Sequence, residues 1–346
     1  MVVMLLIGIG RITHHFVETF SKPGVKIVIL LHLFISAVTQ QKAQPTTVKR
    51  LFLLSALPFV VTQFIVAAQA WAKPLVVTTI RPMTMLVEAV AGDHVEVKQL
   101  LPDSEVPHHY SLRISDQALL AEADVLLWVG PELEGFLSKS VTALRPEKVI
   151  TAAELPDIQW LSSSPEGKAE NRDPHIWMNP NNGRVIATEV SNWLAAHYPD
   201  QREHLLAAQQ VFNRQLHGVT TATAAQLQTL QQESFIVDHD AFGHFAEAFG
   251  LRQSGALKTS TGLSSGARDF HQLSNQKNVR CIIAEPRHHH GRVEQLSTKM
   301  KANIAEIDPL GADIPLSHQA YIQLIEDIGN KLTACLSSVP PAPEPK

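Results

Sequence analysis

The sequence predicts an α/β protein of two lobes, each a mainly parallel sheet with flanking helices, joined by one long helix. Three observations lead to this prediction. Strand-like and helix-like runs alternate over residues 73–198, and the alternation resumes over residues 233–338. Between them, residues 199–232 hold one Pro-Asp break and then a run rich in Gln, Ala and Leu. A helix of roughly 30 residues would be about 45 Å long, which is more than one small domain needs, so we expect it to connect two lobes.

The first lobe is predicted over residues 73–198. Gly92 is expected to end one helix, and Ser115 is suited to begin another as its N-cap. Residues 156–174 hold three prolines and a Ser-Ser-Ser run, which predicts a surface loop. The expected elements are strands at 75–79, 95–101, 124–129 and 148–151, and helices at 82–90, 115–123 and 132–144.

The second lobe is predicted over residues 233–338, after the connecting helix at 199–232. Residues 339–346 are rich in proline and are expected to form a disordered tail. The expected elements are strands at 235–237, 253–258, 279–284 and 304–307, and helices at 241–249, 266–276, 292–302 and 317–336.

Residues 48–72 have the pattern of a cleavable secretory signal peptide. Lys49 and Arg50 form the positive region, residues 51–66 the apolar region, and the small residues Ala68, Ala70 and Ala72 the cleavage site. We expect the mature chain to begin at Trp71 or Lys73. The alternative is an uncleaved membrane anchor, for which the apolar segment is short.

A signal peptide that starts near residue 48 leaves residues 1–47 in front of it. We interpret them as an extension from a start codon assigned too early, because Val48 can serve as an alternative initiator. They are therefore left out of the reasoning about the fold.

The rest of the chain is acidic. Residues 1–72 hold six of the 29 Lys and Arg residues and one of the 33 Asp and Glu residues, so the remainder has a net charge near −9. This balance argues against nucleic acid as a partner. The two cysteines, Cys281 and Cys335, lie within this body, and in an oxidising compartment such a pair is expected to form a disulfide. The alternative is two buried thiols.

His108 and His239 follow apolar runs at separate places in the chain, and Asp308 is placed in the same way near the C-terminus. His175 lies between two prolines, Pro174 and Pro180, before a long helical run. In open α/β sheets ligands gather at the carboxyl ends of strands. Because His108 and His239 fall on either side of the long helix, the natural site is the cleft between the lobes. A lone histidine is more often a core or surface residue, so the shared placement carries the prediction. We predict that the three histidines hold one divalent transition metal, with Asp308 close to the fourth position.

Five segments also form a recognisable set. They are Pro107-His108-His109-Tyr110-Ser111-Leu112-Arg113, residues 124–130 with Pro131-Glu132, Asp173-Pro174-His175-Ile176-Trp177, His239-Asp240-Ala241-Phe242 and Ile307-Asp308-Pro309-Leu310-Gly311. In this order, over about residues 73–337, the chain resembles the cluster A-I metal-binding proteins of ABC importers, and most of all their periplasmic zinc-binding members.

The resemblance implies two α/β lobes joined by one rigid helix, with the metal between them. It places the ligand histidines on His108, His175 and His239, and an acidic residue near the metal on Asp308. It also implies a disulfide between Cys281 and Cys335, the positions at which enterobacterial zinc members carry theirs.

The implied function is capture of Zn²⁺ in the periplasm and its delivery to an inner-membrane zinc ABC permease, with no catalysis; we expect a monomer. Manganese-binding relatives place Glu where His239 stands. Imidazole nitrogens suit zinc, whereas carboxylates suit harder cations such as manganese.

The chain also departs from its relatives. Many zinc members have a long loop dense in histidine before the second ligand, whereas residues 156–174 contain no histidine. Some have Glu directly before the first ligand, where this chain has Pro107. The fourth position is therefore open to Asp308, to His109 or to water.

Other histidines have a simpler interpretation. His288, His289 and His290 could collect metal, but a solvated loop is the expectation favoured here, and His244 is expected on the surface. A zinc hydrolase is the main rival function, since three histidines and an open position suit activated water. The sequence has no HExxH motif to support it. A third alternative, a cell-surface adhesin with the same lobes, usually needs a surface anchor.

Overall fold

The computed structural model describes residues 73–161, 172–286 and 290–338. The predicted extension at 1–47, signal peptide at 48–72 and tail at 339–346 lie outside these residues, as do His288 and His289. Among the described residues, no helix combines the length and apolar character needed to cross a membrane.

The N-terminal sheet has four parallel strands in the order β2-β1-β3-β4. The central strand β3 is buried along its whole length, as expected for a parallel sheet with helices on its faces. The strands are β1 (Leu75–Thr78), β2 (Glu96–Gln99), β3 (Val125–Trp128) and β4 (Val149–Thr151). The accompanying helices are α4 (Arg81–Ala91), α5 (Ile114–Glu122), α6 (Ser138–Val141) and α7 (Pro180–His197).

The C-terminal sheet repeats this arrangement, with four parallel strands in the order β6-β5-β7-β8. In each sheet the first strand in the chain lies between the second and the third. The strands are β5 (Ser234–His239), β6 (Arg252–Lys258), β7 (Val279–Ala284) and β8 (Asn303–Glu306). The helices are α9 (Gly243–Phe249), α10 (Ala267–Ser274) and α11 (Gly291–Met300). The predicted fold class of two parallel sheets with flanking helices is therefore confirmed.

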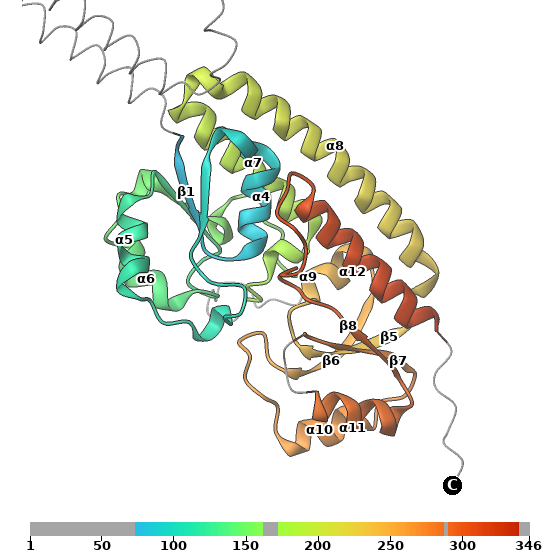
Figure 1. The fold of residues 1–346 in the computed structure, drawn as a ribbon. Helices are drawn as coiled ribbons and strands as arrows, with labels where there is room; N and C mark the ends of the chain where they lie inside the picture. The colour runs from blue at the N-terminus through green and yellow to red at the C-terminus, as the bar shows by residue number, and fades with distance from the viewer. Residues whose placement is uncertain (1–72, 162–171, 287–289, 339–346) are drawn as a thin grey trace, which may run out of the picture. The chain divides into compact units, whose positions relative to one another are not determined.

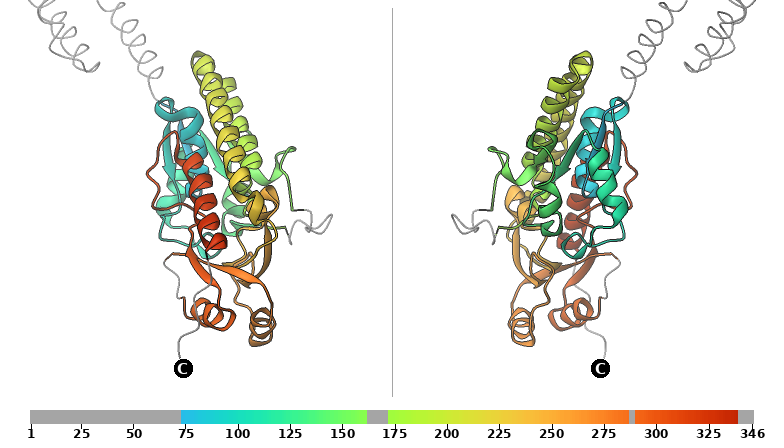
Figure 2. Two further views of the ribbon diagram at one scale, coloured as in Figure 1. Left: turned by 90° about the vertical axis from the view of Figure 1, so that its right-hand side faces the viewer. Right: turned by 90° about the vertical axis from the view of Figure 1, so that its left-hand side faces the viewer.

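The long helix is also present. Helix α8 (Arg202–Leu227) is extended by short 3-10 turns at Pro199–Gln201 and Gln228–Leu230. Its buried residues recur at spacings of seven and four along one narrow stripe, which packs against its neighbours, while the other faces are polar. These residues are Leu205, Phe212, Leu216, Thr223 and Leu227. Helix α8 packs mainly against α7, α4 and α12 (Ala320–Ser337) and also contacts α9. The views show α12 running beside α8 (Figures 1 and 2).

The larger hydrophobic core is continuous between the two sheets. Alternate residues of β5 divide between two cores: Phe235 and Val237 belong to the larger core, which also contains residues of β1 and β3. Ile236 belongs to a smaller core that includes residues of α10 and α11, the two helices that lie on one side of the C-terminal sheet (Figure 1). This period of two is the geometry of a strand buried on both faces. One face of the C-terminal sheet therefore packs into the same core as the N-terminal sheet.

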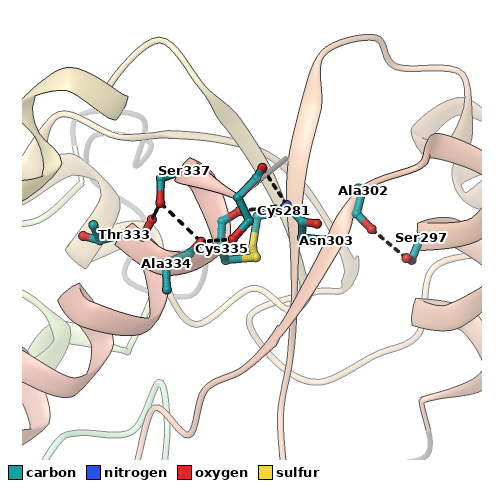
Figure 3. Close-up of a disulfide and its surroundings, with 9 residues drawn as sticks. Cys281, Ser297, Ala302, Asn303, Thr333, Ala334, Cys335 and Ser337 are labelled. Carbon is teal, nitrogen blue, oxygen red and sulfur yellow. Dashed lines mark hydrogen bonds between the residues drawn. A yellow bond between two sulfur atoms is a disulfide. The ribbon is translucent and has the colours of Figure 1, made fainter. Parts of the chain in front are cut away.

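Cys281 and Cys335 form a disulfide, as predicted, with a Cα–Cα distance of 5.7 Å. The bond joins β7 to α12. Beside it, the side chain of Asn303 donates to the Cys335 carbonyl at 3.0 Å (Figure 3). The last helix is thus fixed covalently to the C-terminal sheet while it also contacts α8 and α4.

The helix predicted at 132–144 is replaced by shorter turns, a 3-10 turn at Gly135–Leu137 followed by α6. The cause is Glu134, whose fully buried carboxylate turns back to accept from the N–H groups of Val129 at 2.9 Å and Gly130 at 3.1 Å. The hydroxyl of Thr79 donates to the same carboxylate. These bonds hold Glu134 outside helical geometry and delay the start of the helix.

Candidate metal centre

His108, His175 and His239 come together from three separate segments of the chain. His108 lies in a 3-10 turn (Pro107–His109) after β2, His175 comes directly before the turn Ile176–Met178, and His239 is the last residue of β5. Each offers one ligand atom, and these atoms all lie within 4.8 Å of one another. The ring centroids are 4.9 to 5.6 Å apart. Among the described residues, no other group of three His, Cys, Asp or Glu residues meets this criterion.

His175 is held by a carboxylate from its own segment. Its ring Nδ1 lies 2.7 Å from Asp173 Oδ1, which also accepts from the His175 backbone N–H at 3.0 Å. Both side chains are buried. Burial alone would raise the pKa of Asp173, but the charge and hydrogen bonds of His175 hold it below its ordinary value. The ionised carboxylate therefore accepts the Nδ1 proton and leaves Nε2 for a metal.

His239 is held in the same way by Glu285, which follows β7. The distance from His239 Nδ1 to Glu285 Oε1 is 2.9 Å, and both residues are buried. Burial lowers the pKa of His239, but the hydrogen bond and charge of Glu285 raise it above its ordinary value. The Nε2 atom of His239 lies 3.3 Å from the Ser260 carbonyl oxygen. Two buried carboxylates thus orient two of the three imidazoles.

Sequence reasoning missed the role of Glu285. The available signal was its position directly after an apolar run, the same position that singled out His108 and His239. The side chain reaches His239 because β5 and β7 are neighbours in the sheet. Asp173 belongs to one of the sequence motifs, but the motif alone predicts no role for it.

The imidazoles lie in a cavity of about 260 Å³. Its walls come from loops at the carboxyl ends of both sheets, including residues 103–108 on one side and Lys258, Glu285 and Pro286 on the other. The predicted position of the site, between loops of the two halves, matches this cavity.

Asp308 lines the same cavity but is not part of the three-histidine group. Its Oδ1 accepts from the N–H of Leu310 and its Oδ2 from the N–H of Ala312, both at 2.9 Å. The carboxylate thus shapes the turn that it begins. The predicted place of Asp308 near the fourth metal position stays a prediction.

The prediction that His244 lies on the surface is wrong. Its exposed fraction is 1%, and its Nε2 donates to the Asp173 carbonyl at 3.0 Å. Helix α9 packs against the turn Ile176–Met178, which places His244 beneath the segment that carries His175. Burial lowers the pKa of His244, so the ring stays neutral and supports this segment.

His290 lies beside the site but not in it. Its Nε2 is 2.7 Å from the Glu285 carbonyl oxygen, which ties the start of α11 to the residue that orients His239. The His109 side chain lies outside the described part of the structure, so its predicted alternative role is left open.

The arrangement suits one divalent cation of intermediate softness. Three neutral imidazoles are typical zinc ligands, and the cavity beside them leaves room for a fourth. Asp173 and Glu285 place two negative charges directly behind the imidazoles, which offsets the charge of a divalent metal.

Comparison with solved structures defines the class. The periplasmic zinc-binding protein TroA from Treponema pallidum has a TM-score of 0.69 and 25% identity, with 77% of this chain and all of that chain covered. The fold of this chain, with its two α/β halves, is thus similar to that of a solved periplasmic zinc-binding protein.

The family follows from the sequence itself. The profile described as "Zinc-uptake complex component A periplasmic", ZnuA, matches residues 76–335, and the chain belongs to this family. Two relatives are both called high-affinity zinc uptake system protein ZnuA. That of Yersinia pestis is 29% identical, covering 77% of this chain and 92% of its own length. That of Haemophilus ducreyi is 27% identical, covering 76% and 93%. The predicted resemblance is confirmed.

Proposed function

We propose that this protein captures Zn²⁺ in the periplasm and delivers it to an ABC permease in the inner membrane. The observation that carries the proposal is the meeting of three imidazoles within 4.8 Å in a cavity lined by loops of both halves. Binding followed by release is the whole task, so the protein is proposed to have no catalytic activity.

The proposed ligands are His108, His175 and His239. Asp173 and Glu285 hold two of the rings with Nε2 toward the metal. Asp308 is proposed at or near the fourth position, because it lines the cavity and its charge would add to that of the two outer carboxylates. It is expected to contribute less than any histidine, since its oxygens already accept two backbone N–H groups.

The remaining proposals concern the whole chain. A cleavable signal peptide at 48–72 would direct export, and residues 1–47 would be dispensable. The lobes at 73–198 and 233–338, the connecting helix at 199–232 and a monomeric state are proposed with the same boundaries as predicted. Residues 288–290 are proposed to be unnecessary for tight binding.

The first experiment is metal analysis of the protein purified from the periplasm without added metal. One equivalent of zinc is expected. Copurification of another metal in place of zinc, or no zinc affinity on titration, would refute the proposed cargo. Turnover of an ester or peptide that depends on bound zinc would favour the hydrolase instead.

Single substitutions then test the ligand set by competitive zinc titration against a chelator. His239→Ala removes a ligand and leaves Glu285 buried without it, so zinc affinity is expected to fall by about 100-fold or more. Asp308→Ala should lower it by a smaller factor. His217→Ala, at an exposed position on α8, is the matched control and should have no effect. Unchanged affinity in His239→Ala would show that the ligands are assigned wrongly.

A further inference from the structure

Arg81 connects the two sides of the metal cavity. It is the first residue of α4, and its side chain is 12% exposed. Its guanidinium donates to three acceptors: Asp103 Oδ2 at 2.6 Å, the Gly311 carbonyl at 3.1 Å and the Ile314 carbonyl. The first acceptor lies before His108, and the other two lie after Asp308.

On one side, Asp103 anchors the loop that leads to His108. Its Oδ1 accepts from the side chain of Gln99, the last residue of β2, at 2.8 Å. The two oxygens of Asp103 thus bind the loop to the sheet and to Arg81. His108 is only partly buried, whereas His175 and His239 are buried. The position of His108 therefore depends on this loop more than the other two imidazoles depend on theirs.

On the other side, Arg81 holds the turn that carries Asp308. Gly311 has φ of +65°, and a Cβ added there would lie 3.1 Å from the Met85 side chain, so the turn packs directly on α4. Trp177, two residues after His175, donates from its indole to the Pro309 carbonyl at 2.9 Å. The turn is thus fixed to the N-terminal half by two donors, of which Arg81 alone also contacts the loop before His108.

We propose that Arg81 is a positioning residue that fixes the His108 loop against the Asp308 turn and so sets the rate at which zinc leaves the site. The inference rests on the proposed zinc-binding function. Release begins when one ligand moves away, and His108 is the ligand whose segment is least buried. While Arg81 holds Asp103, that first step requires a charge-assisted bond to break as well.

Lysine cannot replace arginine in this role. The three acceptors lie around a planar guanidinium, whose donors point in fixed directions, whereas a lysine ammonium is a compact group at the end of a flexible chain. Arg81→Lys keeps the charge near Asp103, but we do not expect it to hold both backbone carbonyls as well.

The test is the dissociation rate of zinc, measured by stopped-flow mixing of the loaded protein with excess chelator. Arg81→Met is expected to raise this rate by about tenfold or more, the scale of one lost charge-assisted bond. Arg81→Lys should raise it by a smaller factor. Asp103→Asn, which leaves Arg81 its two carbonyl acceptors, should also raise it.

Arg280→Met is the matched control. Arg280 pairs with Glu233 at 2.9 Å near the start of β7, and neither residue lines the cavity. Both arginine variants are expected to lower the melting temperature of the zinc-free protein, but only Arg81→Met should accelerate zinc loss.

The outcomes separate the two claims. If the unmodified protein binds no zinc, the proposed function fails. If it binds zinc tightly and Arg81→Met releases zinc at the unmodified rate, the function stands and the role of Arg81 is refuted. Equal acceleration in Arg81→Met and Arg280→Met would likewise refute it, by showing that general destabilisation causes the effect.

Discussion

At the scale of single residues, two buried carboxylates lie next to the imidazoles of the candidate site in the absence of a metal. Asp173 and Glu285 are buried carboxylates, and each is bonded to the Nδ1 atom of one imidazole. Burying an unpaired carboxylate would be costly, and the imidazole N–H offsets part of that cost. The same bond fixes the orientation of the ring through Nδ1.

Glu285→Gln tests the contribution of this charge. The amide oxygen can still accept from His239 Nδ1, so the ring stays oriented while the negative charge is lost. Zinc affinity is expected to fall by about 10- to 100-fold, the usual effect of losing such an outer partner. Competitive chelator titration measures it, with the exposed Glu294→Gln on α11 as the control. Equal affinities in the two variants would show that the charge of Glu285 does not matter.

A second prediction concerns the buried Glu134. Burial raises its pKa to about 7, despite the hydrogen bonds that lower it. The folded state therefore binds this proton more tightly than the unfolded chain, whose value is near 4.5. The stability that Glu134 contributes is present below pH 4.5 or so, and it is lost as pH rises through about 7.

Glu134→Gln removes this titration. Relative to that variant, the free energy of unfolding of the zinc-free protein should fall by up to about 3 kcal/mol as pH rises through this range. Urea unfolding of both proteins at several pH values provides the measurement. A difference that does not change with pH would contradict the assigned pKa shift.

The sequence predicts the three histidines but not the carboxylates that orient their rings. His108 and His239 are visible because they follow apolar runs, and a strand end is a local feature. His175 is marked instead by the prolines on either side of it, Pro174 and Pro180. Glu285 acts on a residue 46 positions away, through the pairing of β5 with β7, and no local pattern specifies that pairing. The burial of His244 was not predicted for a related reason, because it depends on the segment at Asp173, 71 residues earlier in the chain.

At the scale of elements, the Cys281–Cys335 disulfide fixes the last helix. Its cysteines are 54 residues apart, and closing such a loop stabilises the fold by about 4 kcal/mol in the chain-entropy model. Replacing both cysteines with serine should lower the free energy of unfolding by up to this amount. Denaturant unfolding measures the loss, and mass spectrometry of exported protein should find no free thiol. Two free thiols would refute the bond in the exported protein.

The close packing of α12 on α8 gives a paired prediction. A Cβ added at Gly329 on α12 would lie 2.6 Å from Thr223 Cγ2 on α8, whereas one added at Gly218 on α8 would meet nothing within 4 Å. Gly329→Ala should therefore cost about 1–3 kcal/mol through overpacking. Gly218→Ala should stabilise the protein by about 0.5–1 kcal/mol, because alanine favours a helix interior. Thermal unfolding compares them, and the same sign for both would contradict the packing described here.

Composition was enough to predict α8, since residues 201–232 have few turn residues and α8 needs only a narrow buried stripe. The helix expected at 132–144 failed because helix propensity competes there with a buried carboxylate that binds its own turn. The outcome depends on the burial of the Glu134 carboxylate, and the local sequence does not show whether a residue is buried.

At the scale of the whole molecule, the two halves share a strand order, and the cavity is lined by loops of both. The alternation of strand-like and helix-like runs predicted this doubling. It did not predict that the halves share one larger core, because the face toward which a strand side chain points depends on what packs beside it.

The shared core has a mechanical consequence. Two bodies joined by a single helix can swing apart at little cost, but here any swing would admit water into the larger core, which holds apolar side chains of both β5 and the N-terminal half. Wetting even 200 Å² or so of such surface costs about 5 kcal/mol. A permease that pulled on the halves would meet this resistance first. We expect the loops that line the cavity to move more easily than the packed halves. Unloading would then require one loop to loosen and would leave the larger core closed.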